Sequence, residues 1–260
     1  MAEFRTSRRG LIKAGLAGLS GVALAGCGKI ASQDWVTNIL DGTNELTYRV
    51  QRAILGEHAM AREYAESDIS PHFKPNGSTD PSDPAYKAMA ADGFKDWKLE
   101  VGGLVDHPFQ ISLAELRAMP SRTQITRHDC VEGWSCIGKW TGVPLGLILD
   151  RAGVKDEARY VLFRCADTMD DGALDGPTRF YGTIDLVAAR HPQTILAYDM
   201  NGAPLQVPYG APLRVRVERQ LGYKSTKYIM KIELVDSYAD EGEGKGGYWE
   251  DNGYDWYAGI

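Results

Sequence analysis

The residues best able to do chemistry lie in one stretch, RHDCVEGWSCIGKW, which runs from Arg127 to Trp140. Cys130 follows an Arg-His-Asp run directly, and a second cysteine, Cys136, lies between two tryptophans. A cysteine in such a setting can be a disulfide partner, a catalytic thiol, a metal ligand or a packed core residue. The stretch alone leaves these four interpretations open.

The N-terminus has the composition of an export signal. A basic start precedes an apolar, Gly/Ala-rich run from Leu16 to Ala25, which is short for a membrane span. SRRGLIK resembles a twin-arginine signal, and LAGC, which ends at Cys27, resembles a lipobox. We expect residues 1–26 to be a twin-arginine signal with a lipobox. The protein would then be periplasmic and tied to the membrane only through a lipid on Cys27; the alternative is ordinary cleavage near ALA.

The cysteine count becomes informative in that compartment. Of four cysteines, Cys130, Cys136 and Cys165 remain after Cys27, an odd number in an oxidising environment. At most one intramolecular disulfide can form, so at least one thiol is free or bound to something. Cys136 is either a small core residue or a partner of Cys165.

Composition excludes some classes of protein. The chain has 260 residues, 43% hydrophobic and 25% charged, which is ordinary for a globular protein with a substantial core. A net charge of -6 argues against a nucleic-acid partner. The five histidines form neither H-E-x-x-H nor H-x-x-x-H, so zinc hydrolase chemistry has little support.

Strands and short helices must position these residues. RTQITRH alternates and predicts a strand with Ile125 facing inward, which delivers its end to Cys130. Ser112 with Glu115 is a capping-box pattern for a short helix, and Gly153 predicts the end of another. Because the elements lack a regular βαβ rhythm, we expect an α+β fold with a mixed, mainly antiparallel sheet and short helices.

An ordered set of segments resembles the sulfite oxidase family of molybdopterin-dependent oxidoreductases, from about Asn76 to the end. CVEGW is similar to the family segment whose cysteine binds molybdenum, which implies Cys130 as the metal ligand. GAPLR is similar to the segment that places an arginine, here Arg214, on the pterin. GYKSTKY resembles the loop that holds the cofactor phosphate, which implies roles for three residues: Ser225, Thr226 and Lys227.

The residue types suit that chemistry. A soft thiolate is a natural ligand for a metal that already carries a dithiolene, and binding itself requires the cysteine to be deprotonated. A phosphate needs positive donors. Arg214 can offer a bidentate fork and Lys227 a point charge, while the N–H groups of Ser225 and Thr226 would complete the cradle.

Other positions match the family less closely. Tyr209 stands where sulfite oxidases have a histidine and the methionine-sulfoxide-reducing relatives an asparagine. Cys165 and Asp167 lie where one branch or the other has a cofactor contact, and the sequence does not choose between them. Asn76 corresponds to an asparagine that touches the pterin. Pro75 replaces the adjacent sulfite-binding arginine, which puts sulfite as the substrate in question.

The C-terminal tail offers another active-site candidate. Tyr254 follows Trp249 in WEDNGY, which resembles a W-x4-Y segment whose tyrosine overhangs molybdenum. The alternative is that the tail aromatics only pack on the core. The resemblance implies a spacer and N-terminal extension over residues 27–95 and a molybdopterin-binding catalytic domain over 96–260, with the aromatic tail packed on it. We expect a minimal monomeric unit, closest in build to the periplasmic methionine-sulfoxide reductase subunit.

The sequence therefore predicts a molybdenum-cofactor oxidoreductase that performs two-electron oxygen-atom transfer on a small substrate. Its partners would be a small-molecule oxygen-atom donor or acceptor and a separate electron carrier, such as a membrane haem protein. Two alternatives stay open: a thiol hydrolase using Cys130 and His128, and a non-catalytic envelope binding module with structural cysteines. Metal analysis of the purified protein separates the three.

Overall fold

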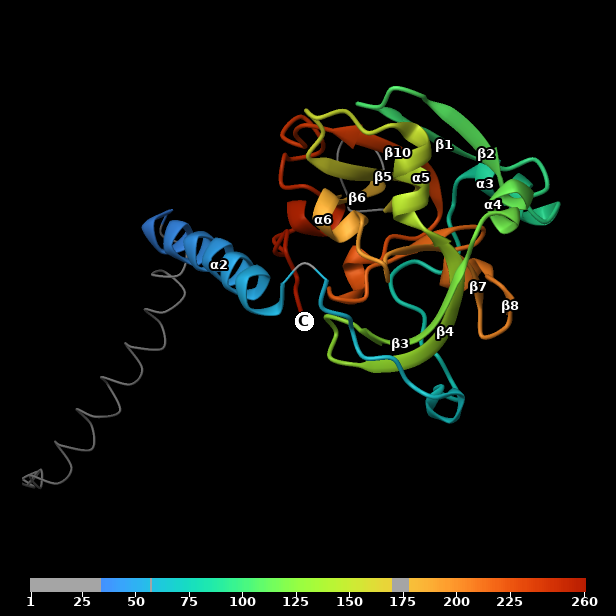
Figure 1. The fold of residues 1–260 in the computed structure, drawn as a ribbon, viewed down its shortest axis with the longest axis horizontal. Coiled ribbons are helices and arrows are strands. Elements are labelled where there is room, and N and C mark those ends of the chain that lie inside the picture. The colour runs from blue at the N-terminus through green and yellow to red at the C-terminus, as the bar shows by residue number, and fades with distance from the viewer. Residues whose placement is uncertain (1–33, 57, 170–177) are drawn as a thin grey trace, which may run out of the picture. The chain divides into compact units, whose positions relative to one another are not determined.

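The structure is a computed structural model that describes residues 34–56, 58–169 and 178–260 (Figure 1). The chain divides into two compact units, Met1–Ala53 and Ile54–Ile260. The predicted export signal and Cys27 lie outside the described residues. The boundary expected at residues 95 and 96 stays a prediction.

The first unit is described as one helix, α2 (Asp34–Leu55). Its exposed side chains include four large apolar ones: Trp35, Leu46, Val50 and Ile54. The helix ends before Gly56, whose φ of 68° is a left-handed conformation that favours glycine. Over the described part of the chain, no helix combines the length and the apolar character that a membrane crossing needs.

The second unit contains two sheets. The first has the order β2-β1-β10-β5-β6 and comprises β1 (Lys98–Gly103), β2 (Phe109–Ser112), β5 (Tyr160–Met169), β6 (Thr178–Asp185) and β10 (Ile229–Val235). Only the β1–β10 pair in this sheet is parallel. Gly103 permits that pairing, because a Cβ at this position would lie 2.3 Å from the carbonyl oxygen of Leu234. The two strands can therefore approach only without a side chain there.

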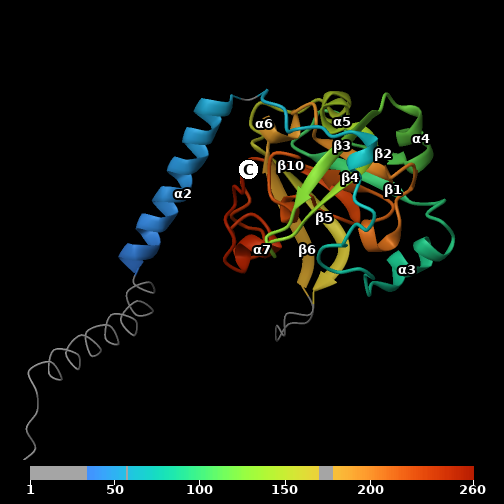
Figure 2. The ribbon, with the colours of Figure 1, turned by 90° about the horizontal axis from the view of Figure 1, so that it is seen from below.

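The second sheet is antiparallel throughout. Its order is β3-β4-β7-β8, with β9 also paired to β7; the strands are β3 (Arg122–Asp129), β4 (Ser135–Pro144), β7 (Ile195–Met200), β8 (Ala203–Pro204) and β9 (Arg214–Arg216). Figure 2 shows β3 and β4 as a long hairpin. Its turn begins at Cys130, whose N–H donates to the carbonyl of Trp134 at 2.9 Å. The predicted fold class, α+β with mainly antiparallel sheets, is confirmed.

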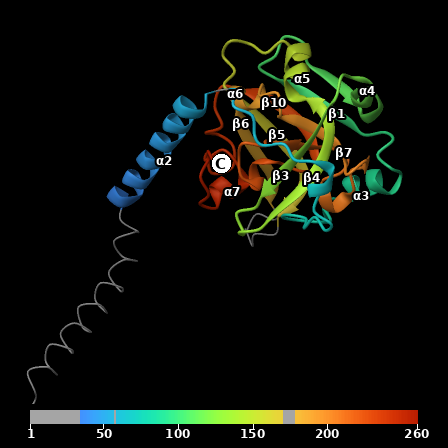
Figure 3. The same ribbon diagram turned by 60° about the horizontal axis from the view of Figure 1, so that its bottom comes forward.

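Short helices connect and cover the strands. The α-helices are α3 (Pro84–Ala91), α4 (Leu113–Ala118), α5 (Leu145–Ala152), α6 (Leu186–Ala189) and α7 (Tyr248–Asp251), and the 3-10 turns are η1 (Glu66–Asp68), η2 (Val207–Tyr209) and η3 (Gly222–Lys224). Ser112 and Glu115 form the predicted capping box at α4. Gly153, with φ 65°, ends α5 as predicted. Figure 3 shows α7 and the C-terminal segment beside β6.

The prediction that Ile125 faces inward was wrong. Ile125 is only half-buried, whereas the other face of β3 is buried and carries polar side chains: Gln124, Thr126 and His128. This face lies against the ion pair between Arg216 and Glu218. Gln124 donates to Glu218 Oε1 at 2.9 Å, so the polar face meets polar partners.

Candidate functional site

A cavity with about 360 Å³ of empty space, part of it open to solvent, lies between the proline-rich loop, the ends of β5 and β6, the segment after η3 and the C-terminal tail. Five of the predicted site residues line it: Asn76, Asp167, Ser225, Thr226 and Lys227. The remaining lining residues are Gly77, Ser78, Met169, Phe180, Tyr223 and Trp249. Segments far apart in the sequence therefore meet at one hollow.

Lys227 is a buried cation without a carboxylate partner among the described residues. Its Nζ donates to three backbone carbonyls, those of Asn76 at 2.6 Å, Pro208 at 3.3 Å and Ser78. Burial, with the charge of Arg214 adding to it, lowers the pKa of Lys227 to about 7. The ammonium thus hydrogen-bonds to backbone dipoles, and the charge of Asp167, which lines the same cavity, only partly offsets the effect of burial.

Arg214 is the second such cation. Its side chain is fully buried, and its Nη1 and Nη2 donate to the carbonyls of Tyr209 at 3.0 Å and Ser225 at 2.9 Å. Its Nε is buried without a partner in the described structure. Burial and the nearby Arg216 lower the pKa of Arg214 to about 9. Arg214 does not line the cavity; it holds the backbone of the segment that does.

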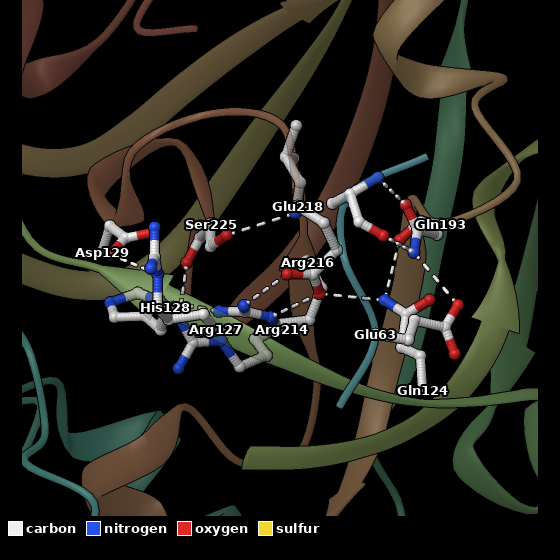
Figure 4. A network of polar contacts seen from close by, with 12 residues as sticks. Glu63, Gln124, Arg127, His128, Asp129, Gln193, Arg214, Arg216, Glu218 and Ser225 are labelled. Atoms are coloured by element: carbon white, nitrogen blue, oxygen red, sulfur yellow. Dashed lines mark hydrogen bonds and ion pairs between the residues drawn. The ribbon is translucent and has the colours of Figure 1, made fainter. Parts of the chain in front are cut away.

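Arg216, by contrast, is neutralised (Figure 4). It forms a two-pronged ion pair with Glu218, through Nε at 3.0 Å and Nη2 at 2.7 Å. Its Nη1 lies 2.7 Å from His128 Nδ1. Burial, with the charge of Arg216 adding to it, holds the pKa of His128 well below its usual value. His128 Nε2 is buried and has no partner among the described residues.

Cys130 lies at the end of β3, half-buried, and carries a free thiol. Burial raises the pKa of this thiol above its ordinary value. Cys130 does not line the cavity, but His128, two residues before it, abuts Gly222 of η3. A Cβ on Gly222 would lie 2.3 Å from His128 Nε2. The strand end that carries Cys130 therefore lies against the start of the segment that carries Ser225, Thr226 and Lys227.

The proline-rich loop also reaches the Cys130 turn. Lys74 forms an ion pair with Glu132 at 3.2 Å, and its ammonium lies 5.1 Å from the ring centroid of Trp134. Tyr209 is tied to the same loop, since its hydroxyl donates to the carbonyl of Phe73 at 3.0 Å. Tyr209 lines a separate hollow of about 650 Å³.

The structure separates the two candidates on β5. Asp167 lines the cavity and accepts a hydrogen bond from Ser78 Oγ at 2.6 Å; burial raises its pKa. Cys165 is fully buried beside it and does not line the cavity. Burial raises the pKa of the Cys165 thiol. Cys136 and Cys165 are both free, so they form no disulfide in this structure.

Tyr254 does not reach the cavity. Its ring stacks on Trp249 at 5.3 Å between centroids, and Trp249 is the tail residue that lines the cavity. The predicted position of Tyr254 over molybdenum stays a prediction, whereas Trp249 of the same W-x4-Y segment lines the cavity. Sequence reasoning missed Ser78, Phe180 and Tyr223. Tyr223 could have been found, because it belongs to the GYKSTKY segment.

Residues 86–242 match the family described as "oxidoreductase molybdopterin binding domain". The chain belongs to this family. A provisionally named protein-methionine-sulfoxide reductase subunit, YedZ1 of Azospira oryzae, is 38% identical over 244 residues, which cover 94% of this chain and 84% of that protein. The oxidoreductase YuiH of Bacillus subtilis, described as uncharacterized, is 33% identical over 193 residues. These residues cover 73% of this chain and 89% of YuiH.

A third relative of this molybdopterin-binding chain is the protein-methionine-sulfoxide reductase catalytic subunit MsrP of Xanthomonas axonopodis pv. citri. It is 39% identical over 165 residues, which cover 61% of this chain and 50% of MsrP. The chain thus matches about half the length of this relative. Among solved structures, the sulfane dehydrogenase SoxCD of Paracoccus pantotrophus aligns with a TM-score of 0.48 and 22% identity, over 55% of this chain and 39% of SoxCD.

The predicted family is confirmed, and the protein is a molybdopterin-dependent oxidoreductase. The residues present fit the cofactor. A molybdopterin phosphate needs buried positive donors, and Lys227 and Arg214 are buried cations whose side chains meet carbonyls instead of carboxylates. The unpartnered buried Oδ1 atoms of Asn76 and Asp167 are acceptors that suit the amino and ring N–H groups of a pterin.

When bound, molybdopterin supplies two-electron redox chemistry at its metal, and the protein positions and insulates it. Lys227 would pair with the phosphate, and the segment held by Arg214 would present the N–H groups of Ser225 and Thr226. Cys130 would supply the protein's sulfur ligand. The cavity has an aromatic lining made by Phe180, Tyr223 and Trp249. This lining would exclude water, because each ring is apolar across its faces.

Proposed function

We propose that the protein catalyses two-electron oxygen-atom transfer on a sulfoxide in the periplasm, with methionine sulfoxide as the substrate class. In this direction a sulfoxide, two electrons and two protons give a thioether and water. The names of the YedZ1 and MsrP relatives support a sulfoxide. The proline at position 75 supports a substrate other than sulfite, because a sulfite-binding arginine would stand there.

One observation carries the proposal that this chain is a working enzyme of its family. Two buried cations form no ion pair with a carboxylate in the described chain: Lys227 lines the cavity that gathers five predicted cofactor residues, and Arg214 holds the backbone of Ser225 in its wall. Burying an uncompensated charge is costly, and an anionic ligand offsets that cost. The site therefore suits a bound phosphate better than an empty, purely structural role.

The thiol hydrolase alternative is disfavoured by the geometry. A catalytic thiol needs a lowered pKa and a base within hydrogen-bond reach. Burial instead raises the pKa of Cys130. His128 is engaged by Arg216 through Nδ1, and its Nε2 lies against Gly222.

The electron donor and the location are also part of the proposal. A separate carrier, such as a membrane haem protein, would deliver electrons one at a time. The twin-arginine signal over residues 1–26 and lipidation at Cys27 rest on the sequence motifs alone. Fractionation of cells tests them: we expect the protein in the membrane fraction of spheroplasts, and a Cys27→Ser variant in the soluble periplasmic fraction.

The main experiment starts from protein expressed with its own N-terminus in a host that makes molybdopterin. We expect about one molybdenum per chain, and turnover of free and protein-bound methionine sulfoxide with a reduced dye as donor. Cys130→Ser should abolish turnover and leave the circular dichroism spectrum unchanged. The matched control is Cys136→Ser, a half-buried free thiol on β4, which should stay active.

Three outcomes contradict the proposal or one part of it. Wild-type protein free of molybdenum would favour a thiol enzyme or a binding module. Full turnover by Cys130→Ser with molybdenum still bound would refute the ligand assignment. Turnover of sulfite but not of sulfoxides would overturn the substrate class alone.

A further inference from the structure

The C-terminal residues 241–260, here called the strap, pack along residues 219–227, here called the cofactor loop. Backbone hydrogen bonds join them at one end, from Leu221 N to the carbonyl of Ala258 at 2.9 Å and from Ile260 N to the carbonyl of Arg219 at 3.1 Å. Further along, the hydroxyl of Tyr223 donates to a strap carbonyl, that of Asp255, at 2.6 Å. The strap therefore follows the cofactor loop over several residues.

A buried ion pair joins the same two segments. Lys224 Nζ of the cofactor loop bonds Glu250 of the strap, and the two side chains are only 2% and 4% exposed. The strap backbone is shaped around this pair: a Cβ at Gly247 would lie 2.1 Å from a carboxylate oxygen of Glu250. A buried ion whose partner is removed is left uncompensated, which is strongly unfavourable. The pair thus couples the position of the loop to that of the strap.

The strap also builds part of the cavity wall. Trp249 of the strap and Tyr223 of the cofactor loop both line the cavity. Tyr254 lies between them, stacked on Trp249 at 5.3 Å and edge-on to Tyr223 at 5.1 Å between ring centroids. Tyr254, the predicted catalytic residue, thus contacts both of these cavity-lining rings.

Other contacts fix the strap to the first sheet independently of the loop. The hydroxyl of Tyr181 on β6 lies 2.5 Å from Asp251 Oδ2 and 2.9 Å from the carbonyl oxygen of Glu241, and its single proton is shared between these two acceptors. Trp256 Nε1 donates to Thr183 Oγ1 at 2.9 Å. A change at Glu250 can therefore disturb the cofactor loop while the strap stays attached to β6.

We propose that the strap completes the cofactor site: Glu250 and Lys224 act as positioning residues that hold the cofactor loop in its phosphate-binding form, and Trp249 walls the cavity. The strap lies almost entirely beyond residues 86–242, which match the family domain. Retention of molybdopterin in this protein thus depends on a segment outside that domain. The inference rests on molybdopterin occupying the cavity, as the proposed function requires.

The test compares Glu250→Gln with Glu243→Gln. Glu243 is the matched control, because it is a strap glutamate whose side chain is 71% exposed and pairs only with Lys245 among the described residues. Pterin released during gel filtration is measured by its fluorescence after oxidation, and hydrogen exchange is followed by mass spectrometry in cofactor-free and loaded protein. We expect Glu250→Gln to release pterin about tenfold faster or more, with faster exchange in residues 219–227 and unchanged exchange in β6.

A double variant guards against simple misfolding. Lys224→Met with Glu250→Leu removes both charges and keeps an apolar contact between the two segments. Replacing both members of a buried ion pair commonly preserves stability, whereas replacing only one leaves an unpaired buried charge. We expect slow pterin release to return in this variant. Trp249→Phe should retain pterin better than Trp249→Ala, since it keeps a ring against the cavity.

The possible failures are distinguishable. Wild-type protein that binds no pterin would overturn the cofactor site and the proposed function with it. With pterin bound, equal release and equal loop exchange in Glu250→Gln and Glu243→Gln would overturn the role of the strap alone. Faster loop exchange without faster pterin release would also overturn it, because the loop would then not govern retention.

Discussion

Replacing Lys227 with methionine in the cofactor-free protein should recover part of the folding free energy that burial of the Lys227 ammonium costs. The change removes a buried ammonium and keeps most of the side-chain length. Burial lowers the pKa of Lys227 from 10.5 to about 7. At 1.36 kcal/mol for each pKa unit, keeping the proton in the folded protein costs about 5 kcal/mol at pH values below both pKa values.

The sign of the pH dependence follows from proton counting. Between about pH 7 and pH 10.5 the unfolded chain holds a proton on Lys227 that the folded protein has lost. The free energy of unfolding of the wild type therefore rises with pH in this window, and below about pH 7 the Lys227 contribution is flat. The variant lacks this slope. From pH 7 to pH 9 the wild type should gain about 2 kcal/mol relative to Lys227→Met.

Urea unfolding of protein from a host unable to make molybdopterin measures this difference. Titrating groups remote from Lys227 are shared, so they cancel when the variant is subtracted from the wild type. Lys155→Met, at an exposed lysine, should follow the wild-type pH dependence. The buried-cation argument would be refuted if the free energies of unfolding of the wild type and of Lys227→Met differed by the same amount, within about 0.5 kcal/mol, from pH 7 to pH 9. In the loaded protein the slope should vanish, because a bound phosphate stabilises the ammonium.

Two further predictions concern packing behind the site. Gly222→Ala should destabilise the protein by about 1–3 kcal/mol and speed pterin release, because its Cβ would lie 2.3 Å from His128 Nε2. Gly102→Ala, where nothing lies within 4 Å of the Cβ position, is the control in the same urea titration. Trp140→Ala should lower the free energy of unfolding, measured by heating, by about 3–5 kcal/mol. The ring of Trp140 is fully buried, and the Cζ atoms of Arg214 and Arg216 lie 5.1 Å and 4.5 Å from its centroid. A loss below about 1 kcal/mol would contradict this prediction.

Some of the fold could be predicted because its signals are local. The capping box of Ser112 and Glu115 and the left-handed Gly153 depend on residues within one helical turn. The strand ending at Cys130 and the mainly antiparallel sheets follow from short alternating runs and turns. The resemblance of ordered segments was specific enough to predict the family, which the comparisons confirmed.

The inward face of β3 could not be predicted. Alternation shows that a strand has two faces but not which one is buried. Ile125 is the apolar choice, yet Gln124, Thr126 and His128 are buried, because the Arg216–Glu218 pair from β9 and the residues after it lies on that side. The partner that makes a polar face acceptable comes from nearly a hundred residues away.

The same limit applies to the site. The sequence by itself determined the family, the residue types that could bind a phosphate and supply a thiolate to a metal, and the order in which they occur. The tertiary structure decided that Asp167 and not Cys165 reaches the cavity, and that Trp249 and not Tyr254 walls it. Local signals depend on neighbours along the chain, whereas burial, charge pairing and the direction of a side chain depend on segments brought together only by folding.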